Sequence, residues 1–342
     1  MKHLITLLMV ACLLVSSLAV AGLAEDAYQY TGTAFMSVGE LKAKIDAKED
    51  IIVIGVVNGL KAIVPFSLEG KGPAETTYRV WGPDYAGKGN PEALSPNYGG
   101  FRLPQEKMVE LLSKAGATAD STIVIYTVNP MHNATRFYWQ VKLLGHENVY
   151  VLDGGINAWD AAKYPTFGTI ELSKESVKSE YVPVSYDPAT FNADIQTVVA
   201  ALENPEEWVV IDARTPDENA GKKTGASSGA YGLGALKGAV HINWDNALNK
   251  DGTLKTKAEL EAIYGDVIEG KKVIAHCQSG VRSAHTVVML RETLGHAEAY
   301  NYDGSWIEWS YVASEAGDDI DAELKAKVLS LTDKWTDNKG AI

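Results

Sequence analysis

The chain has 342 residues, of which 46% are hydrophobic and 22% charged, and its formal net charge at pH 7 is −13. This acidic balance argues against binding to nucleic acid or to anionic membrane surfaces, and no basic run offsets it. The length suits two ordinary domains, each large enough to bury its own core.

Residues 1–24 are predicted to be a secretory signal. A positive residue, an apolar core and small residues at the cleavage site follow one another, with cleavage after Ala21 or Ala24. Lipoprotein processing at Cys12 is less favoured, because the apolar stretch before it is brief and a longer one follows. No other segment is long and apolar enough to cross a bilayer. We therefore expect an exported protein, in the bacterial periplasm, with no membrane span in its mature form.

The chain contains two cysteines, Cys12 and Cys277, and the predicted signal removes the first. A disulfide within the mature chain is then impossible. A lone thiol in an oxidising compartment is unusual unless the protein uses it.

An internal duplication follows the signal. Segments align without a gap at an offset of 150 residues: 122–126 with 272–276, 144–146 with 294–296, and 153–159 with 303–309. Residues 52–54 match 209–211 at a slightly different offset. Similarity at so long a period predicts two homologous domains rather than a solenoid.

The predicted boundaries are a first domain over residues 35–163, a linker over 164–189, a second domain over 190–313 and a tail over 314–342. The linker is polar and rich in proline. The tail is expected to be a solvated cap, with one helix over 321–331 and a frayed end. The insertion over 215–236 is expected to form a mobile loop over a cleft.

The second repeat alternates short apolar runs with helical segments. Strands are predicted at 208–213, within 238–242, at 272–276 and at 297–302, and helices at 257–264, 283–294 and 306–315, with Thr256 as an N-cap. The pattern indicates an α/β fold with a parallel sheet covered by helices on both faces. Functional side chains are expected just past the carboxyl ends of its strands.

One such strand end carries Cys277, followed by a short loop and a helix. Backbone N–H groups of such a loop and the positive end of the helix dipole favour thiolate over thiol, and the thiolate is the nucleophile. Arg282 adds a positive charge that lowers the thiol pKa and can hold an anionic substrate. A buried, inert cysteine is the other interpretation. The loop favours covalent catalysis by the cysteine.

Four motifs carry a family resemblance: Asp-Ala-Arg at 212–214, Gly-Ala-Val-His-Ile-Asn-Trp at 238–244, the loop from Cys277 to Arg282, and Asp-Gly-Ser-Trp-Ile-Glu-Trp at 303–309. Together they resemble the rhodanese family, and the arrangement is similar to tandem-domain thiosulfate and 3-mercaptopyruvate sulfurtransferases. The resemblance implies two homologous rhodanese-like domains, each a parallel sheet covered by helices on both faces. It also implies that only the second domain is catalytic.

The first repeat lacks the reactive residues of the second. Thr127 stands where the second repeat has Cys277, His132 where it has Arg282, Gly55 where it has Asp212, and Val57 where it has Arg214. We expect the first domain to be catalytically silent and to form one wall of the cleft. A ligand-binding role built on Asn129, His132 and Arg136 is the alternative.

The resemblance implies a double displacement in which Cys277 takes sulfur from thiosulfate, or from 3-mercaptopyruvate, and passes it as a persulfide to cyanide or a thiol. The acceptor can also be a periplasmic redox or sulfur-carrier protein. Arg214, Arg282 and Ser279 are the expected substrate-binding residues, with Arg282 paired to a carboxylate as the structural alternative. Asp212, Gln278, Gly280 and Val281 are expected to support the loop. The donor stays open, with thiosulfate favoured.

Other residues have structural interpretations. His276 is predicted to be a strand residue rather than a general base, and Trp306 and Trp309 to be core and cleft-wall residues. We expect no cofactor, and no histidine spacing indicates a metal site.

Two other functions fit the loop. One is a sulfur or polysulfide carrier that loads sulfur but turns over poorly. The other is cysteine-dependent phosphatase or arsenate reductase chemistry. Phosphatases of this kind place one residue more between cysteine and arginine, so the tighter loop here suits a single sulfur atom better.

Overall fold

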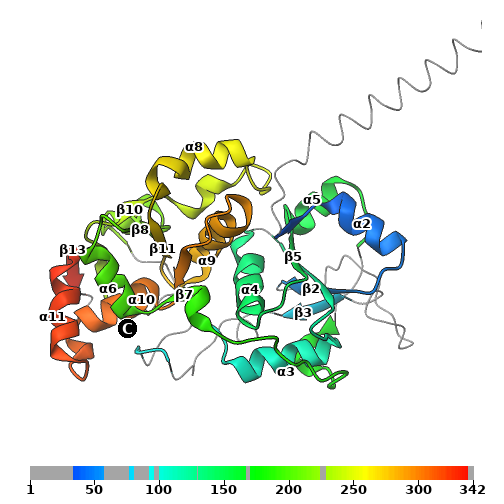
Figure 1. Ribbon diagram of the computed structural model, residues 1–342, viewed down its shortest axis with the longest axis horizontal. Helices are drawn as coiled ribbons and strands as arrows, with labels where there is room; N and C mark the ends of the chain where they lie inside the picture. Colours follow the sequence, from blue (N-terminus) through cyan, green and yellow to red (C-terminus); the bar gives the residue numbers. More distant parts are fainter. Residues whose placement is uncertain are drawn as a thin grey trace, which may run out of the picture.

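The computed structural model describes residues 34–57, 77–80, 92–95, 100–128, 130–166, 170–223 and 229–337. The predicted signal at 1–24 and the residue Asn129 lie outside these ranges. Two sheets flanked by helices lie side by side along the long axis of the molecule (Figure 1).

The first sheet has six parallel strands. Their spatial order is β1 (Phe35–Met36), β5 (Val149–Leu152), β4 (Thr122–Thr127), β2 (Ile51–Val56), β3 (Thr77–Val80) and β6 (Ile170–Glu171). β6 belongs to the segment predicted as the linker, so the first sheet takes in part of that segment.

The second sheet has five parallel strands. Their spatial order is β7 (Asn192–Ala193), β12 (Ala299–Tyr302), β11 (Lys272–His276), β8 (Trp208–Asp212) and β10 (Val240–His241). Strand for strand, this repeats the order of β1, β5, β4, β2 and β3. The duplication and the α/β class are thus confirmed.

The helices cover both faces of each sheet. They are α2 (Val38–Asp46), α3 (Gln105–Ala115), α4 (His132–Leu143), α5 (Gly155–Ala161), α6 (Ile195–Glu203), α7 (Pro216–Asn219), α8 (Lys257–Ile268), α9 (Val281–Val288), α10 (Ser305–Ala313) and α11 (Ala322–Ser330). A π-helical turn at Met289–Thr293 extends α9, and 3₁₀ turns lie at Leu172–Lys174, Pro188–Thr190, Trp244–Ala247 and Glu315–Gly317. Thr256 is the N-cap of α8, as predicted, in a capping box with Glu259.

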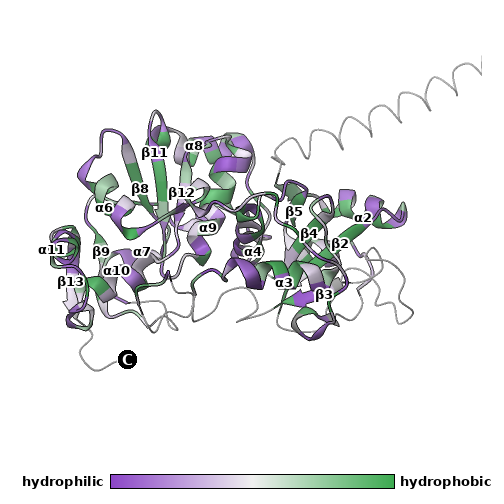
Figure 2. Ribbon diagram, turned by 60° about the horizontal axis from the view of Figure 1, so that its bottom comes forward, coloured by the Kyte–Doolittle hydropathy of each residue, from purple (hydrophilic) through white to green (hydrophobic). Residues whose placement is uncertain are grey.

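Alternating side chains of the strands enter different cores. Ile52 and Ile54 of β2 face the largest apolar cluster, whereas Ile51 and Val53 face a second one that packs against α2 and α5. The largest cluster continues through α4 and α9 into the second domain, where it takes in β8 and β11. Figure 2 shows the hydrophobic strands of both sheets between partly hydrophilic helices. Among the described residues, no helix is both long and apolar enough to span a bilayer.

The two domains meet about an approximate twofold axis. α4 and α9 are equivalent helices and pack against each other, and Thr135 Oγ1 lies 3.4 Å from His285 Nδ1, its equivalent 150 residues later. A second pair of contacts is reciprocal. Asp153 accepts from the backbone N–H of Leu254 at 2.8 Å, and Asp303 accepts from that of Arg102 at 2.9 Å. Such self-complementary contacts are those of an isologous dimer.

The tail differs from its prediction. α11 forms where a helix was expected. The prediction of a frayed end after it is wrong, because β13 (Thr332–Asp337) follows and pairs antiparallel with β9 (Gly232–Leu236). The insertion at 215–236 is likewise not a loop throughout, because it contains α7 and β9, while residues 224–228 lie outside the described ranges. Long-range pairing between two irregular-looking segments stabilises both.

Candidate active site

Cys277 follows β11 directly and precedes α9, as predicted. Between them Gly280 adopts a left-handed conformation with φ +73°. A Cβ atom at this position would lie 2.6 Å from both the carbonyl oxygen and Oδ1 of Asp303. Only glycine therefore fits the turn that leads from the cysteine into the helix.

Three side chains hold the loop around the cysteine. Ser305 Oγ accepts from the backbone N–H of Cys277 at 3.1 Å and from that of Gly280 at 2.9 Å. Asn301 donates to the Gly280 carbonyl at 3.1 Å and accepts from Ser283 Oγ at 2.6 Å. Asn301, Ser283 and Ser305 were not predicted as site residues, although Ser305 lies in the quoted Asp-Gly-Ser motif.

The thiol of Cys277 is polarised toward thiolate. Burial opposes ionisation, but Arg282, the Ser283 hydroxyl and the backbone N–H groups of Ser283 and Ser279 together lower the pKa of Cys277 below its ordinary value. Ser283 Oγ lies 3.6 Å from Sγ. The hydroxyl beside the sulfur is thus that of Ser283, whereas Ser279 contributes its N–H. A substrate contact by the Ser279 hydroxyl stays a prediction.

Arg282 forms a two-pronged ion pair with Glu218, with both N–O distances at 2.8 Å. Although burial opposes it, this arginine holds the pKa of Glu218 at about 2. The carboxylate pairing considered as the alternative for Arg282 is therefore present. Glu218 was missed, yet Thr215 and Glu218 form a capping box that is readable in the sequence. Anion binding by Arg282 stays a prediction.

Arg214 and Asp212 form a second, fully buried ion pair. Arg214 donates to the carboxylate from Nε and Nη2, to the Gly234 carbonyl at 3.1 Å, and lies over the ring of Trp306. Asp212 also accepts from the Arg214 backbone and from Asn219. These contacts fix the turn after β8. Substrate binding by Arg214 and loop support by Asp212 stay predictions.

The remaining predicted residues occupy the surroundings of the loop. The Gln278 carbonyl accepts from Ile307 N–H at 3.1 Å, and its buried side-chain amide has no hydrogen-bond partner among the described residues. Val281 is the first residue of α9. Burial lowers the pKa of His276 to about 4, so its ring is neutral at pH 7. Trp306 and Trp309 are fully buried.

The strand register of the first domain allows its residues to be compared with those of the Cys277 site. Gly55 lies opposite Tyr126 as Asp212 lies opposite His276, which confirms the equivalence drawn from sequence. Thr127 donates its hydroxyl to the Val56 carbonyl. Neither position carries an ionisable group, so this end of the first sheet holds no thiolate.

Cys277 is 0% exposed and shares a small apolar cluster with Ala213 and Trp244, against which Leu248 packs. Trp244 and Leu248 also line an open pocket of about 450 Å³, to which Pro130 of the first domain contributes. The rings of His132 and Trp244 pack edge-on, with their centroids 4.5 Å apart. Burial, and to a smaller extent the nearby charge of Arg282, lowers the pKa of His132 to about 3. Pro130 of the first domain thus lines the same pocket as Trp244, and a cleft wall formed by this domain stays a prediction.

Removing the Arg282–Glu218 pair is expected to raise the pKa of Cys277. The double variant Arg282→Met, Glu218→Gln leaves no buried charge unpaired, so the change reports the loss of the cation beside the thiol. At a pH below the pKa of the thiol, raising that pKa by one lowers the thiolate fraction about tenfold. The pH profile of alkylation by iodoacetamide measures this. In Glu218→Gln alone, Arg282 remains, so the pKa of Cys277 read from the profile should stay low. Overlapping profiles of the wild type and the double variant would show that Arg282 does not lower the pKa of Cys277.

No group of histidine, cysteine, aspartate or glutamate side chains suited to a metal ion occurs among the described residues. The only free cysteine among them is Cys277.

Comparison with known proteins identifies the repeated unit. The family model described as "Rhodanese-like domain" matches residues 92–162 and 195–311. The chain is 35% identical over 212 residues to "Putative thiosulfate sulfurtransferase 1" of Mycobacterium bovis, which covers 60% of this chain and 73% of the relative. It is 31% identical over 208 residues to "Thiosulfate sulfurtransferase" of Corynebacterium glutamicum, covering 60% of this chain and 68% of the relative.

Solved structures agree on the fold. The crystal structure of Tum1 protein from Saccharomyces cerevisiae superposes with a TM-score of 0.65 at 18% identity, covering 83% of this chain and 96% of that one. This likeness concerns the arrangement of both domains, since the alignment spans nearly the whole of that chain.

Proposed function

Because this chain belongs to the rhodanese family, we propose that it is a sulfurtransferase whose Cys277 carries sulfur as a persulfide. One observation carries the proposal: Cys277 lies in the turn between β11 and α9, where, against the effect of burial, Arg282, the Ser283 hydroxyl and the backbone N–H groups of Ser283 and Ser279 lower its pKa. Two relatives named as thiosulfate sulfurtransferases, at 35% and 31% identity, support the same activity.

The proposed reaction has two displacements. The Cys277 thiolate attacks the outer sulfur of thiosulfate, a new S–S bond forms, the old S–S bond breaks, and sulfite leaves with its electron pair. A cyanide or thiolate acceptor then attacks the terminal sulfur of the persulfide and regenerates the Cys277 thiolate. The N–H groups of Ser279 and Ser283 that lower the thiol pKa also stabilise the negative persulfide sulfur.

Thiosulfate is the donor we propose, with 3-mercaptopyruvate as the other candidate. The names of the two relatives support thiosulfate. Arg282 is the cation that lowers the pKa of the thiol, but it also forms an ion pair with Glu218. The loop N–H groups and Arg282 are therefore expected to share the donor's charge.

The burial of Cys277 supports a second candidate, a carrier that releases sulfur only to a chosen partner. Trp244 and Leu248 stand between the thiol cluster and the pocket of about 450 Å³. Because Trp244 and Leu248 border both, we propose that the sulfur donor and acceptor reach Cys277 through this pocket. Export to the periplasm is part of the proposal too, and rests on residues 1–24 alone.

Intact mass spectrometry tests the proposal. Incubation with thiosulfate should add about 32 Da, the mass of one sulfur atom, and cyanide should remove it with release of thiocyanate. If 3-mercaptopyruvate adds sulfur to the protein and thiosulfate does not, 3-mercaptopyruvate is the donor. Loading that cyanide discharges slowly, but a partner protein quickly, would favour the carrier. No gain with either donor would exclude the sulfurtransferase.

A further inference from the structure

The carbonyl of Gly280 is held from both domains. Asn301 of the second domain donates to it at 3.1 Å, and Arg136 of α4, in the first domain, donates from Nη1 at 3.3 Å. Arg136 is 0% exposed. Its Nη2 also donates to the carbonyl of Gly100 at 2.9 Å and lies 2.5 Å from Asp303 Oδ1. One guanidinium thus contacts three acceptors, and two of these belong to the catalytic domain.

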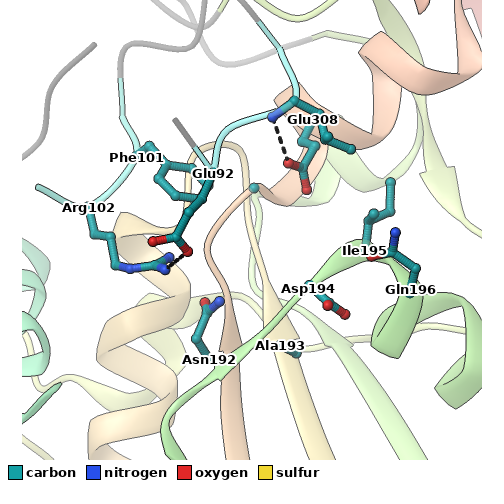
Figure 3. A pocket seen from close by; sticks show the side chains of 11 residues that line it. Glu92, Phe101, Arg102, Asn192, Ala193, Asp194, Ile195, Gln196 and Glu308 are labelled. Atoms are coloured by element: carbon teal, nitrogen blue, oxygen red, sulfur yellow. Dashed lines mark hydrogen bonds and ion pairs between the residues drawn. The ribbon is translucent and has the colours of Figure 1, made fainter. Parts of the chain in front are cut away.

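Asp303 connects a second arginine of the first domain to the same place. Its Oδ2 accepts from the backbone N–H of Arg102 at 2.9 Å and lies 3.4 Å from Nη1 of that residue. Figure 3 shows Arg102 pointing toward Glu92, with which it forms an ion pair. Asp303 packs directly on Gly280. Through Asp303, the buried Arg102 and Arg136 therefore contact the segment that carries Cys277.

We propose that Arg136 is a positioning residue for Cys277, supplied by the domain that has no reactive cysteine of its own. The Gly280 carbonyl and the Val281 N–H belong to one planar peptide unit, so fixing the carbonyl fixes the first N–H of α9. The direction of the loop N–H groups in turn sets how well they stabilise negative charge on the sulfur. This inference rests on the proposed function, in which Cys277 is the nucleophile.

The role is geometric rather than electrostatic. Arg136 forms a buried ion pair with Asp303, so the two charges largely cancel at the sulfur. The groups that lower the pKa of Cys277 are Arg282, Ser283 and Ser279. A lysine at position 136 would keep the charge opposite Asp303, but a single ammonium cannot reproduce the planar fork that holds three acceptors.

The test is the variant Arg136→Lys. We expect its alkylation profile with iodoacetamide to move upward by about 0.5 in pH or more, which reports a raised pKa of Cys277. Sulfur loading from thiosulfate should slow about tenfold, since small displacements of a reacting group cost this much or more. A merely structural role would lower the melting temperature without moving the alkylation profile.

Arg291→Lys is the matched control. Arg291 also donates to two backbone carbonyls, those of Thr190 at 3.0 Å and Ala299 at 3.1 Å, but both lie away from the loop. Its profile and loading rate should equal those of the wild type.

The outcomes separate this inference from the proposed function. A wild-type profile and loading rate in Arg136→Lys would overturn the positioning role and leave the sulfurtransferase standing. If the alkylation profile of Arg136→Lys is shifted but neither it nor the wild type loads sulfur, the positioning role stands and the sulfurtransferase proposal is overturned. If Arg136→Lys does not fold, Arg102→Lys should shift the profile the same way by a smaller amount, and an unshifted profile there would overturn the inference.

Discussion

Cys277→Ser is expected to abolish sulfur loading from any donor and to leave the fold intact. The serine hydroxyl does not ionise near pH 7, so the first displacement loses its nucleophile, and the rate falls on the order of 10⁴-fold. The smaller side chain stays within the cluster of Ala213 and Trp244. Ser283, at 3.6 Å from Sγ, offers the new hydroxyl a hydrogen-bond partner. Intact mass and thiocyanate release measure the loss.

The melting temperature of Cys277→Ser serves as its control. It should change by only a few degrees, since the hydroxyl adds about 1 kcal/mol of desolvation in a buried site. Sulfur retained by this variant would mean that the persulfide forms elsewhere, and the assignment of Cys277 would be wrong.

Gly280→Ala is expected to impair both stability and sulfur loading. The new methyl group would meet the backbone oxygen of Asp303 at 2.6 Å, and the residue would keep a φ of +73°. Strain of roughly 1–3 kcal/mol follows from the backbone conformation alone. Relief of the clash must move the loop away from Asp303, and loading should fall about 100-fold. Urea unfolding and the loading rate measure the two effects.

Gly295→Ala isolates the contribution of the clash. Gly295 has nearly the same φ, +74°, but a Cβ atom there would meet nothing within 4 Å. This variant should lose about 1 kcal/mol of unfolding free energy and none of its loading rate. Equal behaviour of the two variants would show that contact with Asp303 does not matter.

Much of the second domain could be predicted from the sequence because its helices and strands are marked by local patterns. The apolar runs placed β11 at its observed bounds and β8 to within one residue. Thr256 marked the start of α8 by ordinary N-cap chemistry. The cysteine followed from its position after a strand and before a helix. By contrast, β13 reads as a polar segment, and only its pairing with β9 makes it a strand.

The supports of the site were missed because they depend on distant contacts. Arg136 is 144 residues from Gly280, and Glu218 is 64 residues from Arg282, so neither pairing can be read from local spacing. Arg136 was noted in the sequence as part of a possible ligand site of the first domain. Its guanidinium is instead occupied by the second domain, through Asp303 and Gly280.

The joining of the two halves in one chain bears on what their boundary can contain. Two separate subunits must meet from dilute solution, which favours a large apolar interface. A covalent tether replaces that encounter with an effective concentration in the millimolar range. The contact surface is then free to include fully buried charges, such as Arg102, Arg136 and Asp303, whose desolvation would weaken association between free partners. Because the domains are tethered, their interface can contain buried charged residues that position the Cys277 loop, at positions where a dimer of free subunits would need apolar contacts.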